Sequence, residues 1–141
     1  MSKYILEPEV AGGIGGNSIL DHQTRPPIIV KLNYEFDDWL GDDLIEGFRC
    51  IICTERLAKA IEESNLTGYA FAECETTQSQ LFYDLNENGL NLPKFIWLKV
   101  IGSESDDFFM MPPFKLLLTE RALNVVKQFN LNNCTIEEYK I

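Results

Sequence analysis

The pattern of apolar and polar positions predicts that one structural unit occurs twice in this chain. Residues 50–57 and 115–122 each contain an apolar run, then Thr-Glu-Arg, then a further apolar residue. The two threonines are 119 − 54 = 65 residues apart, and the same spacing relates Leu57, Ala60, Ile61 and Leu66 to Ala122, Val125, Val126 and Leu131. Apolar residues three and four apart predict an amphipathic helix, and a threonine before a glutamate is a typical helix start. We therefore predict two strand–helix–strand units, over about residues 48–75 and 113–140.

Two further segments are predicted to be strands. In residues 28–36 apolar and polar side chains alternate, which is typical of a strand with one buried face. That face would carry Ile28, Val30, Leu32, Tyr34 and Phe36. Residues 95–101 are apolar at nearly every position, as in a central strand covered on at least one face. These elements predict an α/β fold bordering on α+β, with a mixed sheet, the two repeated units and helices packed on the sheet.

Length and charge narrow the possible functions. The chain of 141 residues and 16.1 kDa fits one domain, residues 1–141. Its formal net charge of −10 repels phosphate backbones, so we expect a basic protein partner and no direct nucleic-acid contact. No early apolar run is long enough for a signal peptide or a membrane span, and the four cysteines lack the spacing of a disulfide framework. We therefore expect a cytoplasmic protein without membrane contacts.

Two acidic stretches are the main candidates for a binding surface. Between Glu35 and Glu46 there are six acids and no base, and Trp39 lies among them. The stretch is either a solvated loop with Asp43 near a helix N-terminus, or a contact surface with Trp39 as its aromatic anchor. Residues 103–107 form a second acidic loop, followed by Phe108.

Catalytic and metal-binding patterns are weak in this sequence. Cys50 and Cys53 have the spacing of a redox or zinc pair, but residues three apart in a strand point to opposite faces, so we interpret both as core residues. His22 is the only histidine and has no nucleophile elbow near it. Arg56 and Arg121 recur in the two units and are suited to tether them through buried ion pairs. We expect no catalytic residue, no cofactor and no metal ion.

The glycine-rich segment Gly12–Gly16 offers an alternative. A phosphate-binding loop would need a strand directly before it and a helix directly after it, usually with a Lys-Ser/Thr pair. Here Asn17, Ser18 and Ile19 follow instead, and then Pro26 and Pro27. A turn is the simpler interpretation, since glycine adopts positive φ at little cost.

The segment Tyr4–Gly13 and the repeated strand-Thr-Glu-Arg-helix units resemble bacterial immunity proteins of polymorphic toxin systems. The nearest groups are immunity families eleven and forty-three, formerly a domain of unknown function. The resemblance implies a small cytoplasmic protein that protects its producer by binding the C-terminal catalytic domain of a cognate toxin. Some members carry paired Cys-x-x-Cys-Gly metal motifs; here Thr54 follows Cys53 and there is no second pair, so a zinc site is not expected.

We therefore predict an immunity protein that occludes the basic active site of a toxin with its acidic loops. The predicted contact residues are Asp37, Asp38, Trp39, Asp42, Asp43, Glu104, Asp106, Asp107 and Phe108. One alternative is a small-ligand or nucleotide-binding enzyme that uses the Gly12–Gly16 loop. A second alternative is a self-assembling structural protein, because the sequence leaves the oligomeric state open.

Overall fold

The computed structural model describes residues 2–140, which form twelve strands and three helices. The strands in the first half of the chain are β1 (Lys3–Glu7), β2 (Glu9–Val10), β3 (Gly12–Ile14), β4 (Ile19–Asp21), β5 (Ile28–Phe36), β6 (Leu44–Gly47) and β7 (Cys50–Thr54). Those in the second half are β8 (Tyr69–Gln78), β9 (Phe95–Val100), β10 (Phe108–Met111), β11 (Lys115–Thr119) and β12 (Thr135–Tyr139). The helices are α1 (Glu55–Glu63), α2 (Gln80–Leu85) and α3 (Glu120–Val126).

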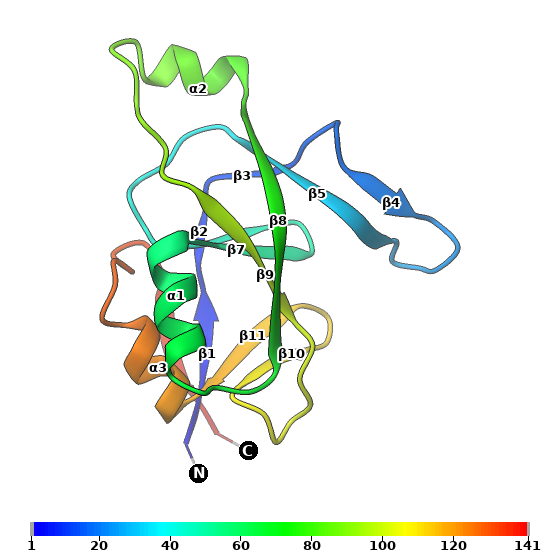
Figure 1. Ribbon diagram of the computed structural model, residues 1–141, viewed down its shortest axis with the longest axis vertical. Coiled ribbons are helices and arrows are strands. Elements are labelled where there is room, and N and C mark those ends of the chain that lie inside the picture. Colours follow the sequence, from blue (N-terminus) through cyan, green and yellow to red (C-terminus); the bar gives the residue numbers. More distant parts are fainter. Residues whose placement is uncertain (1, 141) are drawn as a thin grey trace.

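The strands form two sheets, with α1 and α3 packed side by side against them (Figure 1). The smaller sheet has the order β10-β11-β1-β12 and is antiparallel throughout. The larger sheet has the order β2-β6-β7-β9-β8-β5-β3, with β4 added to β5, and mixes parallel and antiparallel pairs. The predicted mixed sheet with helices packed on it is confirmed, and the arrangement is best described as α+β.

Both predicted strand–helix–strand units are present, and each is part of a larger repeat. Unit A has the strand order β6-β7-β9-β8 with α1, and unit B has the order β10-β11-β1-β12 with α3. The registers agree: Ile52 faces Trp97 in unit A as Leu117 faces Ile5 in unit B. The counterpart of β9 in unit B is β1, which comes from the opposite end of the chain. Unit B is therefore completed by a strand far from it in sequence.

The helix starts have the form that the sequence predicts. The side chains of Thr54 and Thr119 accept hydrogen bonds from the main-chain N–H groups of Leu57 and Ala122, and a glutamate occupies the first turn of each helix. The buried faces of the two helices meet the inner faces of both units. This first core contains residues such as Leu6, Leu57, Leu98, Leu118 and Val126.

The larger sheet closes on itself into a small barrel. Residues 9–14 pair with β6 at one end, where Glu9 faces Ile45, and with β5 at the other, where Gly12 faces Phe36. The Tyr34 hydroxyl donates to the main-chain oxygen of Glu46 at 2.8 Å and accepts from the N–H of Ala11 at 3.2 Å, which ties both sides of the closure together. A second core fills this barrel, with members Ala11, Leu32, Tyr34, Phe36, Ile45, Cys50, Ile52, Phe82, Phe95 and Trp97.

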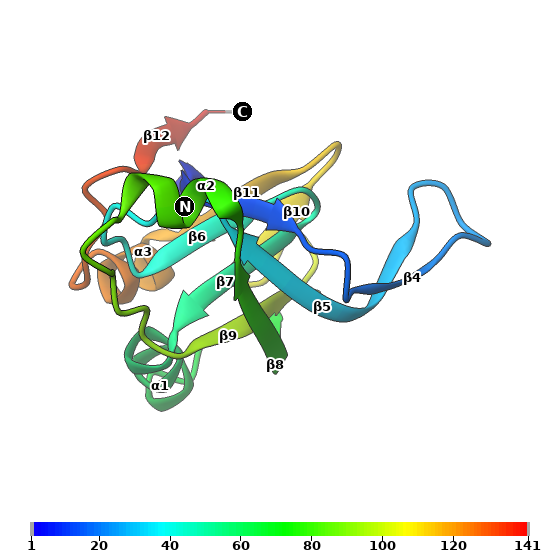
Figure 2. The ribbon, with the colours of Figure 1, turned by 90° about the horizontal axis from the view of Figure 1, so that it is seen from above.

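A hairpin projects from the barrel. The segment from Asn17 to Lys31, which we call the arm, contains β4 and the first half of β5. Its outer end projects beyond the rest of the molecule (Figure 2), whereas Asn17 and Ile29 at its base still contact the barrel. The prediction of one continuous buried face on β5 is right for Leu32, Tyr34 and Phe36. It is wrong for Ile28 and Val30, which are 54% and 61% exposed, because both lie in the arm and the buried face of β5 begins only at Leu32.

Among residues 2–140, no helix has both the length and the apolar character needed to cross a membrane.

Candidate functional site

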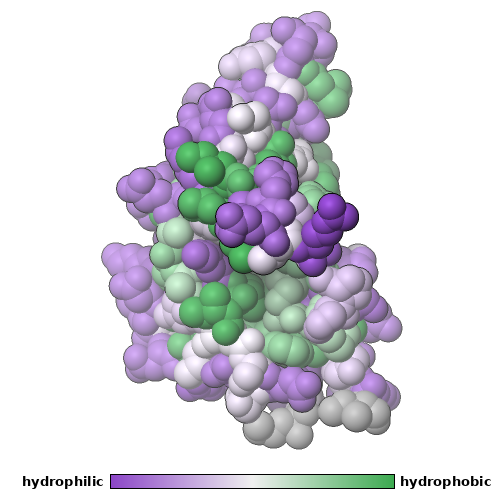
Figure 3. All heavy atoms as spheres, turned by 90° about the vertical axis from the view of Figure 1, so that its right-hand side faces the viewer, coloured by the Kyte–Doolittle hydropathy of each residue, from purple (hydrophilic) through white to green (hydrophobic). Residues whose placement is uncertain are grey.

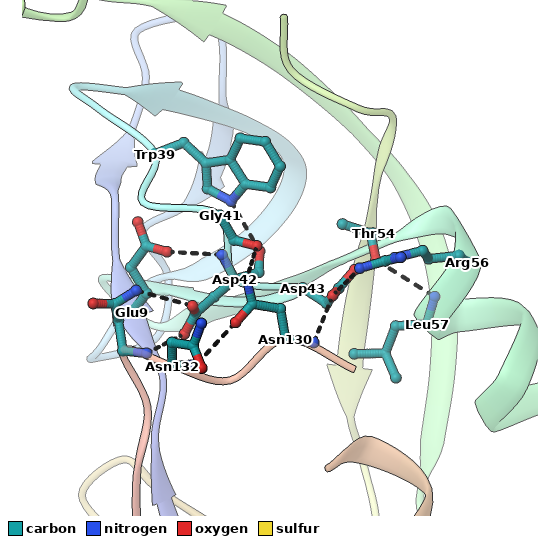
Figure 4. Close-up of polar contacts among 11 residues, drawn as sticks. Glu9, Trp39, Gly41, Asp42, Asp43, Thr54, Arg56, Leu57, Asn130 and Asn132 are labelled. Carbon is teal, nitrogen blue, oxygen red and sulfur yellow. Dashed lines mark hydrogen bonds and ion pairs between the residues drawn. The ribbon is translucent and has the colours of Figure 1, made fainter. Parts of the chain in front are cut away.

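The first acidic loop, residues 37–43, is held in place by carboxylates that point into the protein (Figure 4). Glu9 accepts hydrogen bonds from the main-chain N–H groups of Leu40, at 2.8 Å, and Asp42, at 3.2 Å. Asp42 in turn accepts from the main chain and the side chain of Asn133, at 2.9 and 3.0 Å. Burial raises the pKa of Glu9, although the two N–H donors oppose that shift.

Asp43 joins the start of α1 to the end of α3. One carboxylate oxygen accepts from the Thr54 hydroxyl at 2.5 Å, and both accept from the Arg56 guanidinium, at 2.7 and 2.6 Å. The N–H of Asn130, after α3, donates to the same carboxylate at 2.9 Å (Figure 4). Burial alone would raise the pKa of Asp43, but the hydrogen bonds from Arg56, Thr54 and Asn130 hold it below its ordinary value.

Asp107 does the same in unit B. It accepts from the Thr119 hydroxyl at 2.6 Å, from Arg121 Nη2 at 2.6 Å and from the N–H of Thr67, after α1, at 2.9 Å. Arg121 also donates to the main-chain oxygen of Asn65. Burial favours a higher pKa, but the bonds from Arg121, Thr119 and Thr67 prevail and lower the pKa of Asp107 to about 2. The prediction that the two arginines tether the units through buried ion pairs is right only in part. Each arginine pairs with a buried aspartate of its own unit, and its side chain is more than half exposed. The contacts between the units are made by the two aspartates, and by Arg121 through the main-chain oxygen of Asn65.

The prediction that Asp42, Asp43, Asp107 and Phe108 contact a partner is wrong. All four are buried, and Asp43 is only 1% exposed. The three carboxylates are satisfied by donors within the chain, and Phe108 belongs to the first core, where it packs edge-on against Tyr69. The charges of the three aspartates therefore stabilise contacts within the fold.

The remaining predicted residues keep part of their surface. Asp37 and Asp38 are half-buried and hold the two ends of α2: Asp37 accepts from the hydroxyl of Ser79, and Asp38 from the side-chain amide of Asn86. Trp39 is half-buried as well, donating to the main-chain oxygen of Asp42 at 2.8 Å and packing edge-on against Phe95.

The second acidic loop lies apart from the first. In it, Glu104 is exposed, and Asp106 is half-buried and accepts from the N–H of Ser103. Asp43 lies at the start of α1 and bonds to Asn130, after the end of α3; Asp107 lies at the start of α3 and bonds to Thr67, after the end of α1. The two helices therefore run in opposite directions, and the two acidic loops lie at opposite ends of the helix pair. A nine-residue helix is about 13 Å long, so the two loops do not form one continuous patch.

The sequence did contain a signal for the internal role of these acids. Asp42-Asp43-Leu44-Ile45 and Asp106-Asp107-Phe108-Phe109 share the pattern Asp-Asp-apolar-apolar, at a spacing of 107 − 43 = 64 residues. The repeat therefore begins before each apolar run. The spacing is 64 residues here and 65 later because the turn between β10 and β11 is one residue longer than the turn between β6 and β7. An acid that recurs with its threonine and arginine in both copies of a repeat indicates a structural role.

What the first loop presents to solvent is an apolar tip. Leu40 is 62% exposed, although its own N–H is fixed by Glu9. The preceding residue, Trp39, lines a groove of about 560 Å³ together with Leu92, Pro93 and Arg56. An exposed leucine on a main chain held by hydrogen bonds, directly after a tryptophan that lines a groove, is suited to bind another protein.

The two cysteines of the Cys-x-x-Cys spacing lie in different cores. Cys53 belongs to the first core and Cys50 to the second, so the prediction that they point to opposite faces is confirmed. Burial raises the pKa of the Cys50 thiol to about 12 and that of Cys53 as well, which disfavours the reactive thiolate. Within residues 2–140, no group of three or more His, Cys, Asp or Glu side chains is arranged to hold a metal ion.

The glycine-rich segment forms a strand and a turn. Gly12–Ile14 is β3, and the next element is the strand β4, so no helix begins after the glycines. A Cβ at Gly12 would lie 1.9 Å from the main-chain oxygen of Glu35. Only glycine fits at this position, because β3 and β5 approach each other closely there.

A scan against protein-family models and a search of curated proteins find no match to this chain. The resemblance to immunity proteins therefore stays a prediction.

Proposed function

We propose that this protein is a non-catalytic inhibitor that neutralises a cognate toxin domain by binding it in the cytoplasm. The contact centre is the tip of the loop at Trp39 and Leu40, and the neighbouring groove receives a side chain of the toxin. Asp37 and Asp38 keep enough exposed surface to contact a basic residue at the edge of the interface. In this proposal Asp42, Asp43, Asp107 and Phe108 support the fold only.

The observation that carries the proposal is the exposure of Leu40 on a main chain fixed by Glu9. An apolar side chain in a flexible loop loses conformational entropy when it binds, whereas one held in place beforehand loses little. A few residues contribute most of the binding energy in protein interfaces, and tryptophan, such as Trp39, is among the residue types enriched there.

The overall charge acts at longer range. A net charge of −10 attracts a basic toxin domain and raises the association rate, and salt screens this effect. Charge thus governs how fast the complex forms, and the apolar tip governs how slowly it dissociates.

The test is protection of cells that express the toxic domain encoded in the reading frame beside this gene. Leu40→Ser with Trp39→Ala should abolish protection and the binding of the purified domain. Asp37→Lys with Asp38→Lys should slow association and reduce its dependence on salt. Ile101→Ser is the matched control, because Ile101 is similarly exposed but lies at the end of β9.

The proposal fails if the Trp39 and Leu40 variant still folds and still protects. Circular dichroism of each variant separates loss of binding from loss of folding. The rival function, nucleotide binding by Gly12–Gly16, predicts a thermal shift with nucleotides. Against the rival, the element that follows those glycines is the strand β4 and not a helix.

A further inference from the structure

The arm exposes a strand edge that is not used within the chain. Ile28 to Lys31 pair with β4 on one side, and on the other side β8 begins to pair only at Leu32, opposite Cys74. Ile19, Ile28 and Val30 are each more than half exposed. Seen from the side on which the arm projects, hydrophobic side chains gather across the middle of the molecular surface (Figure 3). Free strand edges with apolar side chains readily pair with another strand.

A second free edge belongs to β12. This strand pairs with β1 on one side and with no other strand among residues 2–140. Ile136, Glu137 and Glu138 are exposed along it. The arm and β12 lie on different sides of the molecule in both ribbon views, so the arm does not reach the β12 of its own chain (Figures 1 and 2).

The arm and β12 carry opposite charges. The arm has Arg25 and Lys31 against Asp21, which makes it a basic segment in a chain of net charge −10. The exposed charges in the middle of β12 are Glu137 and Glu138. Two acidic molecules repel each other at most orientations, so contact through the arm and β12 is favoured over contact through other surfaces.

We propose that the protein forms a two-fold dimer in which the arm of each copy adds as a strand to β12 of the other. The fold already contains a related pairing, because β5 pairs with β8, and β8 is the unit A counterpart of β12. Reciprocal exchange uses both edges of both copies and closes the assembly, as in most soluble oligomers. This inference is independent of the toxin-binding proposal, since the arm and β12 lie outside the 37–41 loop.

Light scattering after size-exclusion chromatography tests the dimer directly. The wild-type chain should elute with about twice its mass of 16.1 kDa. An arm variant, Arg25→Glu with Lys31→Glu, should be monomeric, and so should a β12 variant, Glu137→Lys with Glu138→Lys. All four side chains are exposed, so folding should be unaffected, which circular dichroism verifies.

Mixing the two variants gives the sharper result. In the mixture the acidic arm of one copy meets the basic β12 of the other, and the basic arm of the second meets the acidic β12 of the first. Both contacts are attractive, so dimers should reappear although each variant alone is monomeric. Glu62→Lys with Glu63→Lys, on the exposed face of α1, is the matched control and should leave the wild-type dimer intact.

A monomeric wild-type chain at high concentration overturns the proposal. So does a dimer that neither charge reversal weakens, or one that the control variant weakens equally. A mass that keeps rising with concentration indicates an open head-to-tail chain and rejects the closed dimer.

Discussion

Two aspartates show how a single residue can connect distant parts of this fold. Asp43 and Asp107 each hold the threonine cap and the arginine of their own unit and a main-chain N–H group of the other unit. Since each carboxylate is buried with at least three donors, its removal leaves those donors without a partner. The charge therefore stabilises the native state even though the arginines extend into solvent.

Replacement of either aspartate should destabilise the protein strongly. We expect Asp43→Ala and Asp107→Ala each to lower the free energy of unfolding by about 2–4 kcal/mol, the range for a broken buried charge network. Glu104→Ala, at an exposed acid of the second loop, should change it by less than about 0.5 kcal/mol. Urea denaturation at neutral pH measures all three. A small effect of Asp107→Ala would mean that its hydrogen bonds contribute little in solution.

The lowered pKa of Asp107 predicts acid sensitivity. Its carboxyl group has a pKa of about 2 in the folded state, against an ordinary value near 3.9 in the unfolded chain. Above about pH 5 both states are ionised and the stabilisation is complete; as the pH falls from about 5 toward about 1 the unfolded chain binds a proton first, so stability is lost. Glu9, whose pKa is raised, contributes with the opposite sign.

Thermal melts of wild type and Asp107→Asn across this pH range isolate the residue. The melting temperature of the wild type should fall more steeply between about pH 4 and pH 2 than that of the variant. Equal slopes would show that the pKa of Asp107 is ordinary in the folded protein.

At the scale of elements, periodic segments were predictable and short irregular ones were not. The helices and central strands have regular apolar spacing, so their sequence indicates them directly. The barrel closure depends on β2 and β3, which have two and three residues and no periodicity. The projection of the arm could not be predicted either, because Ile28 and Val30 follow the same apolar alternation as Leu32 although they lie outside the core.

The same limit applies to the candidate site. Composition showed two acidic stretches but not which carboxylates point inward, since burial of an acid depends on donors that the fold brings from elsewhere. Asp43 meets Asn130, and Asp42 meets Asn133, from the opposite end of the chain. The exposure of Leu40 was not predictable for a related reason: an isolated leucine between acids has no pattern, and the hydrogen bond from its N–H to Glu9 fixes the loop in this position.

The glycines of β3 test whether this element is structural. Gly12→Ala should destabilise the protein by about 2 kcal/mol or more, because its Cβ would meet the main-chain oxygen of Glu35 at 1.9 Å. Gly13→Ala should have little effect, since nothing lies within 4 Å of its Cβ. Chemical denaturation compares the two neighbours. Equal destabilisation would contradict the close approach of β3 and β5 that closes the barrel.

At the scale of the whole molecule, the two cores share strands and should unfold together. The strands β7 and β9 place Cys53 and Leu98 in the first core and Ile52 and Trp97 in the second. If one core unfolds, β7 and β9 lose the packing on one face, and the apolar side chains on that face become exposed to water. A state in which only one core is folded would therefore expose a large apolar surface. The aspartate bridges add to this coupling, because each of them spans both units.

We therefore expect a single cooperative transition. Tryptophan fluorescence reports the barrel, since Trp39 and Trp97 both pack in the second core, whereas far-UV circular dichroism reports the strands and helices of both cores together. The two signals should have the same urea midpoint in the wild type and, at a lower midpoint, in Asp107→Ala. Distinct midpoints in the wild type would mean that the barrel and the helix layer unfold separately. Distinct midpoints only in the variant would mean that the aspartate bridge, rather than the shared strands, makes the two cores cooperative.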